Sequence, residues 1–585
     1  MKKLAIIGCG LALAVAVGTI PTEISVSAAK STYTSYVAAA TQGSGLQIEP
    51  TVIYEPSTFD DLNAAAKTNK PASVILTPDS GMDVTLDGTK HSMKITYDSY
   101  VKGKFIPIVR LNGDTVGAFL DWLKTDYAVS DIMAMSDDIK VIETLYADET
   151  GYLVNTVYDL TEETLSQNRY QEWTHIAEAN KAGCNILMYD GSDENLPVVA
   201  EYVEAMTKVC WAVVEDKAEA VGAIAAGCYG VVGADNAMLR ESVKLFSEPG
   251  FARAQYIAAH RGITKYANEQ SLTGIMAAHN EGATHVEIDI QVTADRKFVI
   301  CHNEDSTAYA DIRGQRFAYS TAEAISKLRL VDYSQKYGDS FATLEDVVKY
   351  MSKTDVILIV ELKIDNASEQ TVDKLKAIEA LKEFMDQHPE IAGHWYAITF
   401  YAPFAEQMRQ FLPEIPLGYL GAGASKKEGA LGVPVWGGGH KGMTDVEGKI
   451  NFLRKYNIGL DESMGAATNT TAQDYIARGY TQNTWTFEDT SHFTYKANVA
   501  TTNKAEECAM LVKTMQGGKV TAAELEAGKA TFPCTTYNGW QVEKECKIIE
   551  VERNGDKVLA VLYLTQQSGN FTVGLYSGLV ELTVE

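Results

Sequence analysis

Short apolar runs alternate with helix-like stretches along most of the chain, and this alternation occurs twice. Between about residues 50 and 250 the runs are TVIY, SVILT, FIPIVRL, DIMAM, YLVNTVY, CNILMYD, CWAVVED and GVVGAD. Between about 254 and 490 they are QYIAAH, HVEIDIQV, FVICH, VILIVELK, WYAITF, PLGYL, NIGLD and NTWTF. Strands that alternate with helices form parallel sheets, and eight such units close into a barrel. The pattern predicts an α/β chain with two (β/α)₈ TIM barrels in tandem.

The residue composition and the apolar pattern change after about residue 491. The last segment is rich in Thr and alternates polar with apolar residues, and an NGD turn at 554–556 separates two such runs. Alternation with a tight turn indicates an antiparallel hairpin, so we expect a small β-sandwich-like domain over 491–585. One stretch in it, KAEECAMLVKTMQ, is expected to be helical.

The N-terminus has the pattern of a secretory signal peptide. Lys2 and Lys3 precede an apolar run, and small residues follow at 27–29. We expect cleavage near Ala28 or Ala29 and a secreted or cell-surface protein. A lipoprotein anchored through Cys9 is the less favoured alternative, because the apolar run before that cysteine is very short. No later stretch has the length of a membrane span.

Charge and cysteine content exclude some classes of function. The 585 residues carry a net charge of -26, which argues against nucleic acid or an anionic membrane as a partner. Cys534 and Cys546 could equally form a disulfide or stay free in an exported domain. The sequence has no CxxC, so a zinc knuckle is unsupported. Four cysteines in strand-like runs are expected to be buried free thiols: Cys184, Cys210, Cys228 and Cys301.

Acidic and basic residues gather at the ends of the second series of strands. Glu287 and Asp289 are two apart, so they share one face of a strand. Taken alone, such a pair is more often a solvated strand face. Together, at the rim where barrels of this type assemble their sites, these groups suit a divalent cation and a phosphate. The strand-end residues are His260, Arg261, Glu287, Asp289, His302, Glu361 and Lys363.

In their order along the chain, these residues resemble the glycerophosphodiester phosphodiesterase family. The pattern opens with HRG at 260–262 and a loosely matching EQS at 269–271. It continues with EIDIQVTADRKFVICH, then TLE in FATLEDVVKY, ELK at 361–363 and the Trp-Thr pair in NTWTF. The resemblance covers about 235 residues and implies metal-dependent hydrolysis of glycerophosphodiesters to glycerol phosphate and an alcohol.

The resemblance also implies a role for each matching residue. His260 and His302 would be the acid–base pair, and Glu287, Asp289 and Glu361 would hold one divalent cation. Ca²⁺ is preferred for an exported protein, with Mg²⁺ as the alternative. Three positions depart from the family pattern: Gln270 stands in place of Asn, Arg296 in place of Gly, and Asn303 in place of Asp. Substrate contacts would come from Arg261, Lys363, Glu269 and Trp485.

The first barrel lacks this chemistry. Its opening has no HRG, no Glu-x-Asp in an apolar run and no strand-end His after its DGT turn, although its close resembles the end of the same family. We therefore expect a signal peptide at 1–29, a degenerate, non-catalytic barrel at 30–250, a catalytic barrel at 251–490 and an accessory domain at 491–585. Two alternatives remain: a lipid phosphodiesterase like phospholipase C or D, and an exported surface protein without activity. The sequence leaves open the oligomeric state, the released alcohol, any association with the cell envelope and whether the substrate is small or polymeric.

Overall fold

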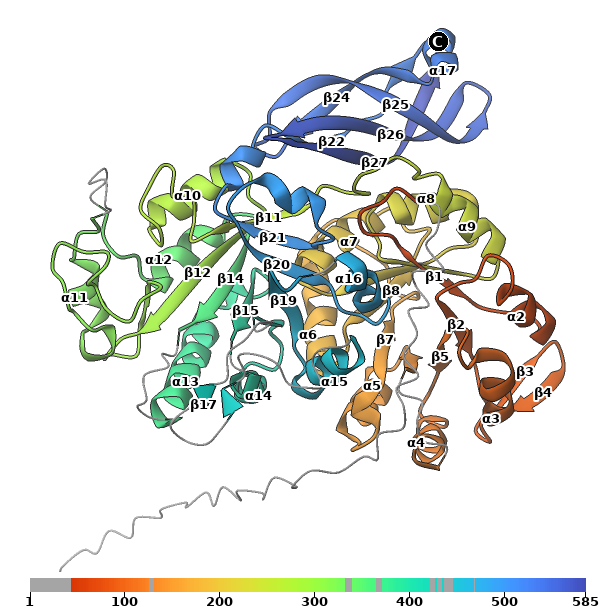
Figure 1. Ribbon diagram of the computed structural model, residues 1–585, viewed down its shortest axis with the longest axis horizontal. Helices are drawn as coiled ribbons and strands as arrows, with labels where there is room; N and C mark the ends of the chain where they lie inside the picture. Colours follow the sequence, from red (N-terminus) through yellow and green to blue (C-terminus); the bar gives the residue numbers. More distant parts are fainter. Residues whose placement is uncertain are drawn as a thin grey trace, which may run out of the picture.

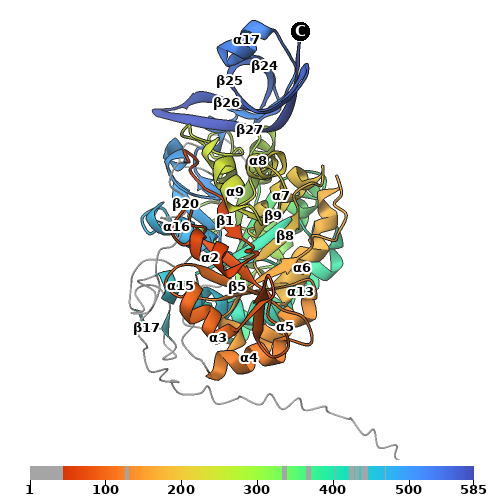
Figure 2. The ribbon, with the colours of Figure 1, turned by 90° about the vertical axis from the view of Figure 1, so that its right-hand side faces the viewer.

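The computed structural model describes residues 44–125, 131–331, 339–363, 371–400, 402–420, 427–428, 434–435, 446–467 and 469–585. The predicted signal peptide and Cys9 lie outside these ranges. Within them, no helix combines the length and the apolar character that a membrane span requires. The structure contains two parallel barrels side by side and a C-terminal sheet above both (Figures 1 and 2).

The first barrel is closed by eight parallel strands, as the sequence predicts. A β-hairpin, β3 (Asp83–Leu86) and β4 (Thr89–Ser92), follows its second strand. Between the strands lie α2 (Phe59–Ala65), α3 (Met93–Thr96), α4 (Val116–Thr125), α5 (Ile139–Ala147), α6 (Trp173–Lys181), α7 (Leu196–Ala205), α8 (Lys217–Ala225) and α9 (Asn236–Lys244). The barrel strands are β1 (Thr51–Tyr54), β2 (Ser73–Leu76), β5 (Ile106–Arg110), β6 (Met133–Ser136), β7 (Asn155–Asp159), β8 (Ile186–Asp190), β9 (Val209–Val213) and β10 (Gly230–Gly233).

Apolar side chains fill the interior of the first barrel. Every strand contributes to one buried cluster, with large members such as Met135 and Trp211. Ile476 and Ala477, which belong to the second barrel, are also members of this cluster. An interior of this kind is a packed core.

The second barrel closes because β11 pairs with both β12 and β21. Its helices are α10 (Leu272–Asn280), α11 (Ala322–Ser326), α12 (Leu344–Met351), α13 (Thr371–Gln387), α14 (Ala402–Phe411), α15 (Val446–Tyr456) and α16 (Asn469–Ile476). Its barrel strands are β11 (Tyr256–His260), β12 (His285–Val292), β14 (Ile357–Leu362), β15 (Trp395–Thr399), β16 (Leu417–Tyr419), β19 (Gly459–Ser463), β20 (Gln482–Phe487) and β21 (Val499–Thr502).

One predicted barrel strand and one predicted boundary are wrong. The run FVICH forms β13 (Phe298–Ile300), which pairs antiparallel with the end of β12 and takes no place in the barrel. The eighth barrel strand is β21, which lies beyond the predicted boundary at residue 490. The strand is only VATT, a run too short and too rich in Thr to stand out, and its pairing with β11 completes the barrel.

The two barrels pack through the N-terminal ends of their strands. His285, at the start of β12, lies 3.0 Å from the carbonyl oxygen of Ala205 at the end of α7. From the other side, the Tyr202 hydroxyl donates to the carbonyl oxygen of Gly393 just before β15, at 2.8 Å. The C-terminal rims therefore face away from each other.

The C-terminal part, for which the sequence predicts a small β-sandwich-like domain, is a single curled sheet of six strands. The predicted hairpin at the NGD turn is present between β25 and β26, with Gly555 at φ +65°. The expected helix at 504–516 is wrong, because only one short turn forms before a strand that pairs with β24. The elements are β22 (Val512–Met515), β23 (Lys519–Val520), α17 (Ala522–Ala527), β24 (Lys529–Thr536), β25 (Gln541–Asn554), β26 (Lys557–Ser568) and β27 (Phe571–Val584).

All seven cysteines in the described residues are free and buried. The predicted free thiols are confirmed, and Cys534 and Cys546 form no disulfide. Cys534 lies opposite Val542, and Cys546 lies opposite Ala530 on the same pair of strands. The two cysteines are therefore offset along the ladder.

Candidate active site

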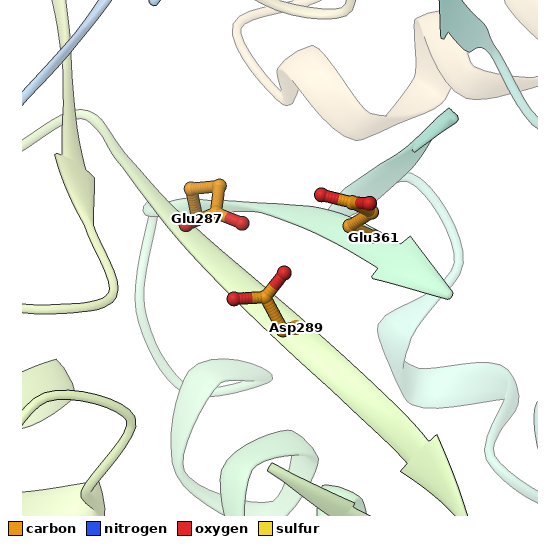
Figure 3. Close-up of side chains that lie close together, drawn as sticks. All are labelled: Glu287, Asp289 and Glu361. Atoms are coloured by element: carbon orange, nitrogen blue, oxygen red, sulfur yellow. The ribbon is translucent and has the colours of Figure 1, made fainter. Parts of the chain in front are cut away.

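Three carboxylates converge at the C-terminal rim of the second barrel. Glu287 and Asp289 project from β12, and Glu361 projects from the neighbouring β14 (Figure 3). Asp289 lies opposite Glu361 in the parallel register, so all three side chains share the inner face. Their nearest oxygens lie within 4.8 Å of one another, and all three residues are buried.

Burial and mutual repulsion disfavour the ionised form of the carboxyl groups in this cluster. Burial, with Asp289 and Glu361 beside it, raises the pKa of Glu287 well above its ordinary value. Burial also raises the pKa of Glu361 to about 7, although Lys363 opposes the shift. Such a site is favourable for ionised carboxylates only when a cation joins them.

Lys363 and Arg261 supply positive charge next to the cluster. The Lys363 ammonium lies 2.9 Å from Glu361 Oε1 and 3.1 Å from Asp289 Oδ1. Arg261 Nε lies 3.5 Å from Asp289 Oδ2, and Arg261 also donates to Glu269 at 3.2 Å. Burial lowers the pKa of both basic groups, but the surrounding carboxylates raise it more, so both remain cations.

The segment after β11 is shaped to bring its backbone to Glu287. Arg261 has φ +60° and Gly262 has φ +81°, so the chain turns sharply at the end of the strand. A Cβ at residue 262 would lie 2.7 Å from the backbone of Gly274, and only glycine fits there. The turn lets the Arg261 amide donate to Glu287 Oε2 at 3.2 Å.

Gln270, one of the departures from the pattern that the sequence resembles, reaches the cluster. Its side-chain amide donates to Asp289 Oδ2 at 2.5 Å, and its side-chain oxygen accepts from the Asp289 amide at 3.3 Å. The residue has φ +61°, a conformation that an Asn also adopts readily. These two hydrogen bonds orient the central carboxylate.

The two histidines lie on the same flank of β12. Because β14 occupies one edge of β12, β11 and β13 must share the other edge, where they pair with residues 285–287 and 290–292. His260 ends β11 and His302 follows β13 by two residues, so both lie on this flank of β12. His260 Nε2 lies 3.8 Å from Glu287 Oε2, and His302 Nδ1 lies 2.9 Å from Asn303 Oδ1.

Trp485 stands on the opposite side of the rim. Its indole N–H donates to the carbonyl oxygen of Asp461 at 3.3 Å, and its ring meets the Phe400 ring edge to face, with centroids 5.4 Å apart. The structure thus places every predicted site residue at one rim: the titratable groups lie on β11, β12 and β14 or in the segments that follow β11, β13 and β14, and Trp485 lies across from them.

Two further residues at this rim were not predicted from the sequence. Asn503 follows β21 and contacts His260 Nδ1 through its Oδ1 at 2.7 Å. Asp461, on β19, is buried, and burial next to Glu361 and Glu462 raises its pKa to about 8. The strand-end acid in NIGLD was a visible signal for Asp461. Asn503 could not be found, because the strand before it was not recognised.

Comparison with known proteins assigns this barrel. Residues 260–505 match the sequence model of the glycerophosphoryl diester phosphodiesterase family. The second barrel belongs to this family. The match starts at His260 and includes β21, in agreement with the closed barrel of the structure.

Individual relatives agree with the family assignment. The chain is 31% identical over 134 residues to a glycerophosphodiester phosphodiesterase of Caldanaerobacter subterraneus, covering 22% of this chain and 53% of that protein. It is 35% identical over 114 residues to a Bacillus subtilis protein named YhdW, covering 18% of this chain and 44% of that protein. The chain thus spans about half the length of the curated relatives it matches. A solved glycerophosphodiester phosphodiesterase of Parabacteroides distasonis aligns with 44% of this chain and 95% of its own, at 20% identity and a TM-score of 0.34.

Proposed function

We propose that the second barrel hydrolyses glycerophosphodiesters to glycerol phosphate and an alcohol. The observation that carries this proposal is the buried carboxylate trio beside two histidines and two cations, at the rim of a barrel of this family. The trio offers a site for a cation, the histidines offer proton transfer, and Arg261 with Lys363 offers charge for a phosphate. Acid–base cleavage of a phosphodiester needs these three elements.

The donor set fits one divalent cation. Glu287, Asp289 and Glu361 would hold it through carboxylate oxygens, which are the ligands that Ca²⁺ and Mg²⁺ prefer. When bound, the ion would neutralise charge on a phosphoryl oxygen. We favour Ca²⁺ for an exported protein, with Mg²⁺ as the alternative; the export itself rests on the N-terminal pattern KK followed by an apolar run and small residues.

His260 is suited to accept a proton. Burial, with Arg261 beside it, lowers the pKa of His260, which keeps the ring neutral at neutral pH. Its Nδ1 faces an amide oxygen, so Nδ1 carries the proton and the Nε2 lone pair points to the carboxylates. His302 would then give a proton to the leaving alkoxide. The attacking group is water or a hydroxyl of the substrate.

The remaining residues would bind the substrate. Arg261 and Lys363 would contact the phosphate, since both are cations held beside the cluster. Glu269 positions Arg261 through their ion pair, and Trp485 forms part of the opposite wall. The first barrel would contribute no turnover, because its interior is a packed apolar core.

The test is a screen of the exported form on several glycerophosphodiesters, with and without a chelator. We expect turnover that the chelator abolishes and that added Ca²⁺ restores. His260→Ala and His302→Ala should each lose about 10²- to 10⁴-fold in kcat and keep the thermal transition of the parent. His279→Ala is the matched control, because His279 lies on α10 and contacts Tyr350 instead of the site. Full activity in excess chelator, or parent-like turnover of both histidine variants, would reject the mechanism.

A further inference from the structure

A cavity lies between the two barrels, on the side where their strands begin. Its volume is about 260 Å³, with its opening to solvent included. The first barrel contributes Lys208, just before β9, and the second contributes Arg409, on α14. Among the described residues that line the cavity, these two cations face no acid. The polar part of the lining is otherwise uncharged: Asn180, Asn185, Thr207, Asn457, Tyr480 and Thr481.

Lys208 is buried without a carboxylate beside it. The residue is 2% exposed, and its ammonium donates to the carbonyl oxygen of Cys184 at 2.8 Å and to Asn185 Oδ1 at 2.9 Å. An ammonium has three N–H donors, so one remains after these two bonds. Burial, with Arg409 nearby, lowers the pKa of Lys208 to about 7. The surroundings of the ammonium therefore supply too little negative charge.

Arg409 also has only uncharged partners among the described residues. Its guanidinium donates twice to the carbonyl oxygen of Asn457 and once each to those of Pro413 and Ile415. A guanidinium has five N–H donors, so one is left. Burial lowers the pKa of Arg409 to about 10, which still leaves a cation at neutral pH. Each of the two cations in the cavity thus keeps one N–H donor.

The carboxylates near this interface are paired with other cations. Glu414 pairs with Lys181 at 2.7 Å, and Asp131 pairs with Arg478 at 2.6 Å. A third interface cation, Arg454 on α15, is 6% exposed, and its Nη1 has no hydrogen-bond partner among the described residues. The described part of the barrel interface therefore carries positive charge that no neighbouring carboxylate balances.

The charge and the donors of the cavity suit a small monovalent anion. A buried charge without a partner is costly, and an anion between the two cations would reduce that cost for both. Phosphate and sulfate carry four oxygens, and a buried oxygen needs a hydrogen-bond donor of its own. Two remaining N–H groups are too few for such an ion, whereas a monatomic anion can accept both.

We propose that this cavity binds a chloride ion, which bridges Lys208 of the first barrel and Arg409 of the second. The ion would accept one N–H from each cation and reduce the repulsion between them. Because its two ligands belong to different barrels, its binding would stabilise the docked arrangement of the barrels. The site is separate from the carboxylate cluster, which lies at the opposite ends of the strands of the second barrel.

The test compares the Tm of the protein in sodium chloride, sodium bromide and sodium gluconate at constant ionic strength. We expect chloride and bromide to raise the Tm of the parent by about 2 °C or more over gluconate, with saturation. Lys208→Met removes the ammonium with little change in volume and should abolish this difference. Lys327→Met is the control, because it removes a lysine whose side chain is 70% exposed, and it should keep the difference.

A second measurement covers the case that Lys208→Met does not fold. Crystals of the parent are soaked in sodium bromide, and we expect an anomalous peak within hydrogen-bond distance of Lys208 Nζ and of the Arg409 guanidinium. Equal Tm values in chloride and gluconate would overturn the inference. A chloride effect that Lys208→Met retains, or soaked crystals without a peak in this cavity, would do the same.

Discussion

His260 Nδ1 lies 2.7 Å from the side-chain oxygen of Asn503, a residue 243 positions later in the chain. The orientation of this amide is set by its other end, since Asn503 Nδ2 donates to Glu488 at 2.8 Å. The amide oxygen must therefore face the histidine, which places the ring proton on Nδ1. This contact leaves Nε2 free to accept a proton, and it links the closing strand of the barrel to the chemistry.

Changing Asn503 should alter the pH profile of the enzyme. Asn503→Asp places a negative charge beside His260 and should raise the pKa of that histidine. A raised pKa means that the neutral ring is lost at higher pH, so the acid limb of log kcat/KM should move to higher pH. Asn503→Leu offers no acceptor and should lower kcat by about tenfold or more at every pH, because the tautomer is no longer fixed. Profiles of both variants that coincide with the parent would show that Asn503 does not position His260.

Divalent cations should stabilise the fold as well as support turnover. An ion that binds only the folded state adds about 2.7 kcal/mol to the free energy of unfolding when its free concentration is about 100 times its dissociation constant. We expect Ca²⁺ to raise the Tm of the parent by several degrees, and a parallel titration with Mg²⁺ to rank the two ions. Glu361→Gln removes one ligand and should lose most of the shift. This measurement does not depend on activity. A Tm that neither Ca²⁺ nor Mg²⁺ changes would by itself argue against a cation site at the carboxylates.

Most of the barrels could be predicted from the sequence, because each strand is a short apolar run between amphipathic helices. β21 was missed for a physical reason. The segment VATT is a strand because it pairs with β11, and the paired residues Tyr256 and Val499 are 243 positions apart, so no local sequence pattern indicates the contact. FVICH is the opposite case, a predicted barrel strand that lies outside the barrel. It reads as a barrel strand, yet the tight turn at Arg296, with φ +59°, folds it back along β12.

The charged part of the site could also be predicted, because its residues end recognisable strands. Asp461 was visible as a strand-end acid in NIGLD but was not assigned, and Asn503 could not be assigned because its strand, β21, was not recognised. The packing of the two barrels was likewise invisible. It depends on residues such as Tyr202 and His285, whose partners lie far away in sequence.

Asp461 should make the stability of the protein depend on pH. Its folded pKa of about 8 exceeds the ordinary value, since burial and the neighbouring acids Glu361 and Glu462 oppose ionisation. The unfolded chain releases this proton near pH 4 and the folded chain only near pH 8, so stability falls as pH rises between these values. The slope is at most about 1.4 kcal/mol per pH unit. Asp461→Asn keeps the shape without the titration. We therefore expect the variant to gain on the parent from pH 5 to pH 8 in urea unfolding, and a constant difference would contradict the assignment.

Arg253 and Glu204 should hold the two barrels together. Arg253 contacts Glu204 at 2.8 Å and also donates to Asn498 at 2.8 Å, so the pair joins α7 of the first barrel to the start of β21 in the second. Glu204 is fully buried. Arg253→Leu would leave this carboxylate without its partner, and removing one member of a buried pair costs about 3–5 kcal/mol. Replacing both residues by Leu leaves no buried charge, so the double variant should lose less than Arg253→Leu alone. Chemical unfolding of the single and double variants measures the coupling. If the losses simply add, the pair does not couple across the interface, and the barrels are held by their apolar contacts.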